Sequence, residues 1–228
     1  MSVSPAPDLA LAPAVSDQTP SPVTDAASFA AATGATPAQI ADLEAFRALL
    51  ADWNGRMNLV GPSALTDFWG RHAYDSAQLL DLAPKALVWA DLGAGAGFPG
   101  LVLAILLKGR PGARVHLVES VAKRCRFLEA VVQALDLPAE VRCARAEDLK
   151  LTVDIVAARA CAPLARLLEF AKPYMDRGAV GLFLKGRGIE AEVREALASW
   201  TFEATLTPSR SDRSGRIVTI RRAGHVQR

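Results

Sequence analysis

Hydrophobic residues follow two different spacings along the chain, and the spacing changes near residue 85. Before that point they recur at helical spacing, as in Ile40, Leu43, Phe46 and Leu50. Thr36 followed by Pro37 is typical of a helix start, because threonine caps the first turn and proline fits its first position. A second stretch of helical spacing follows residues 61–63. The pattern predicts a small helical cap over residues 37–84.

From residue 86 onward, short apolar runs alternate with helical stretches. The runs that predict strands cover residues 87–92, 115–119, 141–144, 154–158 and 179–184. Helices are expected between them, at residues 99–107, 122–135, 164–174 and 189–200. Two later strands, near residues 201–206 and 217–221, flank a polar loop and are expected to pair as an antiparallel hairpin. Because repeated strand–helix units are typical of a parallel sheet covered on both faces, residues 85–228 predict an α/β domain with a mostly parallel seven-stranded sheet.

Composition limits the protein class. The 228-residue chain is 51% hydrophobic and 22% charged, which excludes a wholly disordered protein. Its longest apolar run, residues 98–107, falls well short of the ~20 residues that a membrane-spanning helix needs. The three cysteines and three histidines are scattered, so we expect no disulfide framework and no metal.

The N-terminal segment differs from the rest of the chain. Residues 1–36 are rich in Ala, Pro, Ser and Thr without periodicity, and we expect a flexible tail. The segment lacks the basic start of a secretory signal and the arginines of a transit peptide, so a cytoplasmic protein is expected. The first 46 residues contain five acidic and no basic residues, which leaves a net charge of +7 on the remainder. A basic body is compatible with nucleic-acid binding but does not by itself predict it.

A glycine-rich loop follows the first strand of the α/β region, with the sequence Asp91-Leu92-Gly93-Ala94-Gly95-Ala96-Gly97-Phe98-Pro99-Gly100. Its last six residues fit the dinucleotide pattern G-x-G-x-x-G. Gly93-x-Gly95-x-Gly97 preceded by Asp91 also fits the loop of S-adenosylmethionine-dependent methyltransferases. A carboxylate would repel a pyrophosphate, whereas it favours the cationic S-adenosylmethionine. Asp91 therefore favours S-adenosylmethionine as the cofactor.

Two further acidic positions suit a nucleoside cofactor. Glu119 ends the second strand, where a carboxylate accepts hydrogen bonds from ribose hydroxyls in either fold. Glu147, after the third strand, would lie beside the adenine, although a solvated turn remains an equal alternative.

Six short motifs in order resemble the bacterial 16S ribosomal RNA guanine-N7 methyltransferases, also called glucose-inhibited division protein B. Besides the glycine loop with its Gly-Phe-Pro-Gly end, these are Trp53-Asn54-x-x-x-Asn58-Leu59, Arg71-His72-x-x-Asp75-Ser76, Glu119-Ser120-x-x-Lys123-Arg124-x-x-Phe127-Leu128, Ala158-Arg159-Ala160 and Leu184-Lys185-Gly186. The chain departs from the family pattern at Val60, where threonine is usual, and at Ala158, where serine is usual.

This resemblance implies a Rossmann-like class I methyltransferase fold and methyl transfer from S-adenosylmethionine to N7 of a specific guanine in 16S rRNA. The substrate would be the rRNA or an assembling small ribosomal subunit, and the enzyme a monomer that uses neither membrane nor metal. The resemblance implies cofactor contacts at Gly93, Phe98, Ala146, Glu147 and Arg159. Gly95 of the loop and Glu119 at the strand end complete the expected cofactor site.

The target atom determines which catalytic residues to expect. Guanine N7 carries a free lone pair and no proton, so transfer to it needs no general base. Arg159 and Lys185, at the ends of the last two parallel strands, are therefore candidates for positioning, and the alternatives are a surface ion pair and a solvated strand end. Lys123, Arg124 and Lys185 are candidates for RNA contact.

Several other residues have a structural interpretation beside a functional one. His72 and Asp75 are expected to make cap contacts, Cys161 to pack, and Trp69 to lie in the core. The loop at residues 209–216 is expected to be mobile and either contacts RNA or is a plain loop. Two rival functions remain open at this point, a small-molecule S-adenosylmethionine-dependent methyltransferase and an NAD-dependent oxidoreductase.

Overall fold

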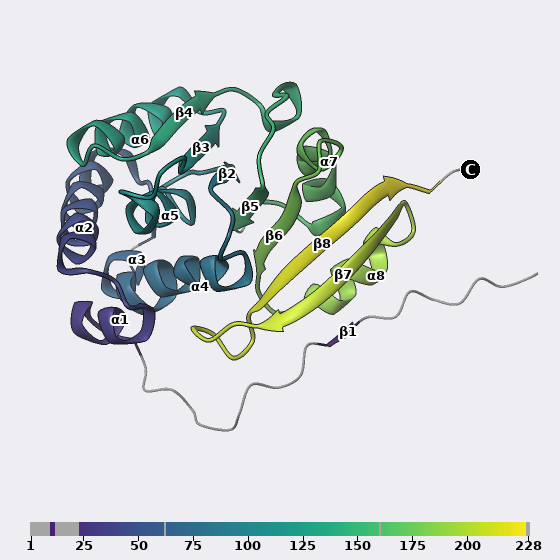
Figure 1. The fold of residues 1–228 in the computed structure, drawn as a ribbon, viewed down its shortest axis with the longest axis horizontal. Coiled ribbons are helices and arrows are strands. Elements are labelled where there is room, and N and C mark those ends of the chain that lie inside the picture. The colour runs from purple at the N-terminus through teal and green to yellow at the C-terminus, as the bar shows by residue number, and fades with distance from the viewer. Residues whose placement is uncertain (1–9, 12–22, 62, 160, 227–228) are drawn as a thin grey trace, which may run out of the picture.

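The computed structural model describes residues 10–11, 23–61, 63–159 and 161–226 (Figure 1). The predicted seven-stranded sheet is present and consists of β2 (Val88–Leu92), β3 (Arg114–Glu119), β4 (Ala139–Cys143), β5 (Ile155–Arg159), β6 (Val180–Lys185), β7 (Trp200–Pro208) and β8 (Arg216–His225). A two-residue strand, β1 (Ala10–Leu11), adds to its edge, and the strand order is β1-β7-β8-β6-β5-β2-β3-β4. Among the strands of the described residues, β8 alone is antiparallel to its neighbours, β6 and β7.

The order places β2 between β3 and β5, both of which are parallel to it. The chain leaves β2 toward β3 on one side and later returns to β5 on the other. In open parallel sheets, ligands bind outside the carboxyl ends of the strands at such a switch point. The glycine loop follows β2 at this position.

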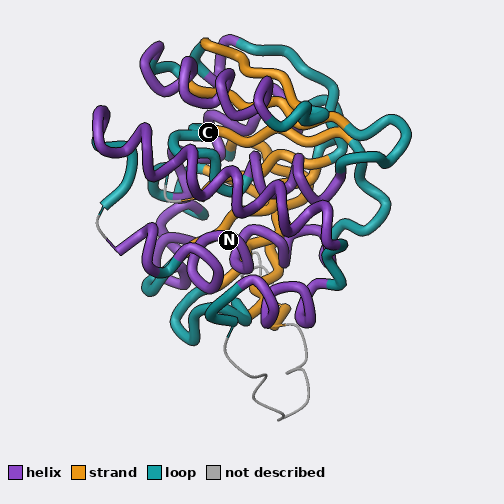
Figure 2. Tube along the Cα trace, turned by 90° about the vertical axis from the view of Figure 1, so that its left-hand side faces the viewer, coloured by secondary structure: helices purple, strands orange, loops and turns teal. Residues whose placement is uncertain are grey.

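Side chains of alternate strand residues pack against helices on opposite faces of the sheet. Trp89 belongs to a core that includes α2 (Pro37–Met57), α4 (Asp75–Leu82), α5 (Gly100–Leu107) and α6 (Ala122–Ala134). Its neighbour Ala90 belongs to a second core with α7 (Leu164–Met175) and α8 (Ile189–Ala196). Figure 2, turned by 90° from Figure 1, shows helices lying over the strands. The prediction of helices on both faces is confirmed.

The cap is larger than predicted, because a helix lies inside the expected tail. α1 (Ala26–Thr33) begins with a capping box between Asp25 and Ser28. Phe29 is fully buried, and its ring centroid lies 5.4 Å from that of Trp69. The prediction of a flexible tail over residues 1–36 is therefore wrong for residues 25–33. The helix has a single buried residue, so no periodic pattern marks it in the sequence.

The rest of the cap packs directly on the sheet. After α2 and the short α3 (Ser63–Thr66), the chain forms η1, a π-helix over Phe68–Tyr74, and continues into α4. Cap residues and strand residues share one hydrophobic core, to which Phe46 and Phe68 contribute. The cap therefore sits beside the glycine loop as part of the same packed body, and its division from the sheet domain at residue 85 stays a prediction. No helix in the described parts of the chain is long and apolar enough to cross a membrane.

Candidate active site

The glycine loop turns across the carboxyl ends of β2 and β3. Gly93, Gly95 and Gly97 have φ values of +71°, +54° and +92°, a region that other residues rarely adopt. The N–H groups of Gly93 and Ala94 both donate to the carbonyl of Val118, at 2.9 and 3.0 Å. A Cβ on Gly93 would lie 2.7 Å from the sulfur of Cys161. The loop is thus held against β3 by backbone hydrogen bonds and can approach a ligand closely.

Asp91 lies behind this loop and does not line the cavity described below. Its side chain is 1% exposed, and Oδ2 accepts a hydrogen bond of 2.8 Å from the N–H of Gly100 at the start of α5. Oδ1 has no partner among the described residues. Burial raises the pKa of Asp91 to about 7, against the hydrogen bond from Gly100, which lowers it. Asp91 therefore holds the start of α5 from behind the loop.

Glu119 lies at the loop, as its position after the second strand predicts. The side chain is 4% exposed, and its two oxygens accept from the N–H groups of Gly95, at 3.0 Å, and Val121, at 2.8 Å. Arg124 reaches the same carboxylate, with 3.7 Å between Nη1 and Oε2. The carboxylate is therefore fixed beside the loop, and Arg124 is paired with it.

A cavity of about 500 Å³ opens between the glycine loop and the cap. Its walls come from the loop, the cap, the ends of β5 and β6, and the β7–β8 loop (residues 209–215). Residues that line it include Gly93, Gly95, Phe98, Arg71, His72, Asp75, Arg159, Lys185, Ser209 and Asp212. The structure thus brings Gly93, Gly95, Phe98, Arg159 and Lys185, all predicted site residues, into one cavity.

Arg159, His72 and Phe98 form a stack at the cavity wall. The guanidinium of Arg159 lies 4.9 Å from the centroid of the Phe98 ring, and its Nη1 donates to the carbonyl of Arg71 at 3.1 Å. The His72 ring centroid lies 4.9 Å from that of Phe98. Burial, followed by the positive charges of Arg159 and Arg71, lowers the pKa of His72 to about 3. His72 is therefore neutral at physiological pH, and Arg159 makes no ion pair within the described residues.

Lys185 lines the cavity but forms an ion pair with a neighbouring carboxylate. Its ammonium group lies 2.7 Å from Oε2 of Glu192 and donates to the carbonyl of Ala162 at 2.8 Å. The side chain is 9% exposed. Lys185 is thus neither the solvated strand end of one interpretation nor an unpaired cation for RNA.

The remaining predicted residues lie outside the cavity wall. Ala146 and Glu147 belong to a 3-10 turn, η2 (Ala146–Asp148), after β4, and the carbonyl of Ala146 accepts from Tyr174 at 3.0 Å. Glu147 is exposed and lies 3.3 Å from Arg145. Lys123 is exposed on the first turn of α6.

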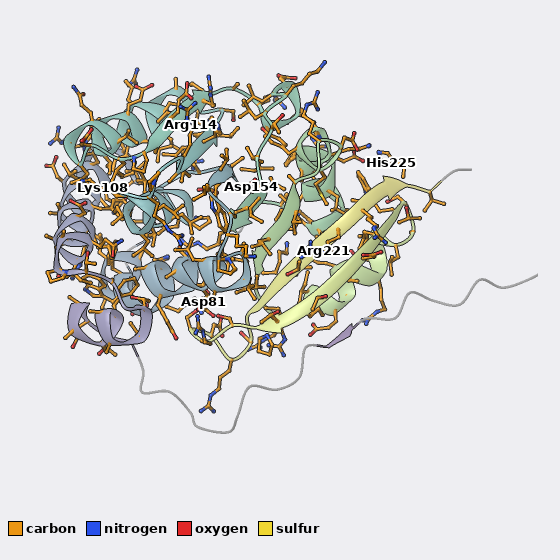
Figure 3. The ribbon with its side chains drawn as sticks, in the orientation of Figure 1. Asp81, Lys108, Arg114, Asp154, Arg221 and His225 are labelled. Atoms are coloured by element: carbon orange, nitrogen blue, oxygen red, sulfur yellow. The ribbon has the colours of Figure 1, made fainter. Side chains whose placement is uncertain are left out.

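The sequence left the β7–β8 loop open between an RNA contact and a plain loop, and it did not predict the loop's contacts with the cap. We expected a mobile basic loop, whereas its side chains are tied to the cap. The hydroxyls of Ser209 and Ser211 donate to Asp75, and the N–H of Arg210 donates to Gln78. Ion pairs join Arg71 to Asp212 and Arg210 to Asp81, which Figure 3 labels on α4 beside this loop. No periodic pattern in the sequence could indicate these contacts, because the paired residues lie 129 to 141 positions apart.

Comparison with known proteins identifies relatives by sequence. The model of the rRNA small subunit methyltransferase G family (GidB) matches residues 39–213. The ribosomal RNA small subunit methyltransferase G of Caulobacter vibrioides (strain NA1000 / CB15N) is 64% identical over 181 residues, which cover 79% of this chain and 84% of that protein. The protein of the same name from Bradyrhizobium sp. (strain BTAi1) is 49% identical over 177 residues, 76% of this chain and 80% of that protein.

Solved structures show the same fold at low sequence identity. Magnesium protoporphyrin IX methyltransferase from Synechocystis PCC 6803 with bound S-adenosylmethionine has a TM-score of 0.52 and 14% identity, covering 78% of this chain and 97% of that chain. The O-methyltransferase from Bacillus cereus, in complex with S-adenosylhomocysteine, has a TM-score of 0.52 and 15% identity, covering 80% of this chain and 91% of that chain. The fold is therefore that of class I S-adenosylmethionine-dependent methyltransferases, and the oxidoreductase alternative is not favoured.

Proposed function

The chain belongs to the rRNA small subunit methyltransferase G family, and from this membership we propose that it transfers a methyl group from S-adenosylmethionine to N7 of one guanine in 16S rRNA. The observation that carries the proposal is the cavity between glycine loop and cap, which joins the loop to Phe98 and Arg159. Both the loop and Arg159 stand in motifs that resemble the family's.

The residues around the loop fit the cofactor. The cavity volume of about 500 Å³ lies in the range of small-molecule sites. Gly93 and Gly95 let a ligand approach the backbone, and the buried carboxylate of Glu119 would accept hydrogen bonds from ribose hydroxyls. When bound, S-adenosylmethionine supplies a methyl group on a positively charged sulfur. Ala146 and Glu147 would meet the adenine end, since η2 follows the strand next to β3.

The protein's own contribution is to orient the guanine. N7 already carries the attacking lone pair, so the residues need to hold it in line behind the methyl group and exclude water. The Arg159 guanidinium is held between the Phe98 ring and the carbonyl of Arg71, which restricts its direction. We propose that Arg159 positions the substrate or the cofactor, and that neutral His72 adds no charge beside the methyl group.

RNA would reach the cavity past the start of α6, where Lys123 lies. Lys123 is exposed and makes no ion pair with a described residue, so it is the candidate phosphate contact among the predicted cations. Arg124 and Lys185 are paired with Glu119 and Glu192, and they would contact phosphate only by exchanging those partners. A cytoplasmic location, a monomeric state and 16S rRNA or the assembling small subunit as partner belong to the same proposal.

The test uses purified protein, S-adenosylmethionine with a labelled methyl group, and small ribosomal subunits or 16S rRNA from cells that lack this protein. We expect one N7-methylguanine to form, at the guanine whose methylation those cells have lost. Arg159→Ala should reduce the rate about 100-fold or more, because positioning groups contribute on that order. Arg166→Ala, whose side chain lies over Phe170 on α7, should keep the wild-type rate.

Two results would contradict the proposal. One is an unchanged methylation map in cells with and without the protein. The other is calorimetric binding of NAD but not of S-adenosylmethionine by the purified protein.

A further inference from the structure

Asp75 is a cavity residue whose carboxylate is held in a fixed direction. It is the first residue of α4 and lines the same cavity as the glycine loop. One oxygen, Oδ1, accepts hydrogen bonds from Ser211 Oγ at 2.6 Å and from Ser209 Oγ at 3.1 Å. Because both donors are hydroxyls of the β7–β8 loop, the loop determines how the carboxylate is turned.

The other oxygen of Asp75 is available to a ligand. Oδ2 accepts no hydrogen bond and makes no ion pair within the part of the chain that the structure describes. Some side-chain atoms of the protein are buried and lack a hydrogen-bond partner, such as Nδ1 of His72 and Oδ1 of Asp91. Oδ2 of Asp75 is not one of them, so it retains contact with solvent. A partly buried residue at a cavity wall thus keeps one carboxylate oxygen accessible.

The chemistry of guanine matches such an acceptor. N7 and O6 are acceptors on one edge of the base, whereas N1–H and the N2 amino group are donors on the Watson–Crick edge. A guanine that turns N7 toward the glycine loop turns its Watson–Crick edge away from that loop. Proteins that take a base out of its stack recognise this edge by hydrogen bonds.

We propose that Oδ2 of Asp75 accepts a hydrogen bond from the N2 amino group on the Watson–Crick edge of the target guanine. Asp75 then selects guanine against adenine, because adenine has no amino group at C2 and its N1 is an acceptor. This inference rests on the proposed function. It assigns a substrate-recognition role to a residue that the sequence suggested only as a cap contact.

A purely structural role for Asp75 makes different predictions. If the carboxylate only ties the β7–β8 loop to the cap, removal of both serine hydroxyls should have the same effect as its replacement. Asp75→Asn keeps the size and the oxygen that faces the serines but places an NH₂ donor where Oδ2 was. The double variant Ser209→Ala with Ser211→Ala removes the tie and keeps the carboxylate.

The experiment measures kcat/KM on 16S rRNA that carries either guanine or inosine at the methylated position. Inosine keeps N7, O6 and N1–H but lacks the N2 amino group. With wild-type protein, inosine should lower kcat/KM about 10-fold or more, as expected for a hydrogen bond to a charged acceptor. With Asp75→Asn, guanine RNA should lose about 100-fold, and inosine should add less than about twofold, because the partner of the amino group has already been removed.

Controls separate recognition from folding. Asp81→Asn, which breaks the ion pair of α4 with Arg210 of the same loop, should keep the wild-type rate and the wild-type inosine effect. Asp75→Asn should bind S-adenosylmethionine within about threefold of wild type. The double serine variant should keep a clear inosine effect.

An undiminished inosine effect in Asp75→Asn would overturn the inference, and so would a double serine variant that reproduces the whole kinetic defect. Either result leaves the proposed function intact, because the wild-type protein still methylates guanine. Absence of rRNA methylation by the wild-type protein would overturn the proposed function and this inference together.

Discussion

Gly100→Ala tests whether the start of α5 holds the glycine loop in place. A Cβ at this position would lie 2.3 Å from Cδ2 of Leu117, 2.6 Å from Oδ2 of Asp91 and 2.9 Å from Cβ of Asp91. Leu117 and Asp91 are 0% and 1% exposed and belong to the neighbouring strands β3 and β2. Neither side chain is free to retreat, so the helix start must move away from the sheet.

The expected cost follows from two contributions. Overpacking a buried contact costs about 1–3 kcal/mol. Lengthening the hydrogen bond from Gly100 to the buried carboxyl of Asp91 costs about 1–3 kcal/mol more. The higher helix propensity of alanine offsets about 1 kcal/mol of this loss. A net loss of about 3 kcal/mol in the free energy of unfolding corresponds to a melting temperature lower by about 6–12 °C for a domain of this size.

Differential scanning calorimetry measures this change, and titration with S-adenosylmethionine measures its effect on the site. Because Gly100 follows Phe98 and Pro99, a displaced helix start should also weaken cofactor binding about 10-fold or more. Gly55→Ala in α2 is the matched control, since a Cβ there meets nothing within 4 Å. It should melt at or above the wild-type temperature. If Gly100→Ala melts within about 2 °C of wild type and binds the cofactor equally well, the reasoning is wrong.

Three further predictions concern buried or paired groups. Burial raises the pKa of Asp91 from 3.8 to about 7, so its contribution to stability is full below pH 3.8 and is lost as pH rises through about 7; Asp91→Asn should remove this part of the pH dependence in urea unfolding, and an unchanged dependence would refute it. Lys185→Met should lower the melting temperature by about 4 °C, because it leaves Glu192 unpaired. The same variant should leave the salt dependence of RNA binding unchanged. A reduced salt slope would instead identify Lys185 as a phosphate contact. Hydrogen peroxide should oxidise Cys125 and Cys143, whose sulfurs lie 2.7 Å apart, to a disulfide with release of two waters. Peptide mass spectrometry measures which cysteines are linked, and a disulfide formed mainly by Cys161 would contradict this prediction.

The sequence by itself determined the order of strands and helices and the place of the cofactor loop. These features depend on spacings within a few residues, because a strand shows a short apolar run and a helix shows a turn-length repeat. The glycines around Gly95 and the acid at Glu119 follow strand ends, and the carboxyl ends of parallel strands meet at one edge. The sequence alone therefore places the loop and Glu119 together.

Local spacing also explains where the prediction failed. α1 buries only Phe29, and a single buried residue produces no repeat that a sequence pattern could show. Its stability comes from the capping box at Asp25 and from packing against Trp69, which lies 40 positions further along the chain.

Only the tertiary structure decided which charged groups are available for chemistry. The sequence suggested Lys185 as an RNA contact, but the fold pairs it with Glu192. It suggested Asp91 as a carboxylate facing the cofactor, but the fold buries that side chain against the N–H of Gly100. The accessible oxygen of Asp75 likewise depends on Ser209, which lies 134 positions away. Partners so distant in the chain meet only through the packing of the whole sheet and cap, and the charge, burial and direction of a side chain depend on those partners.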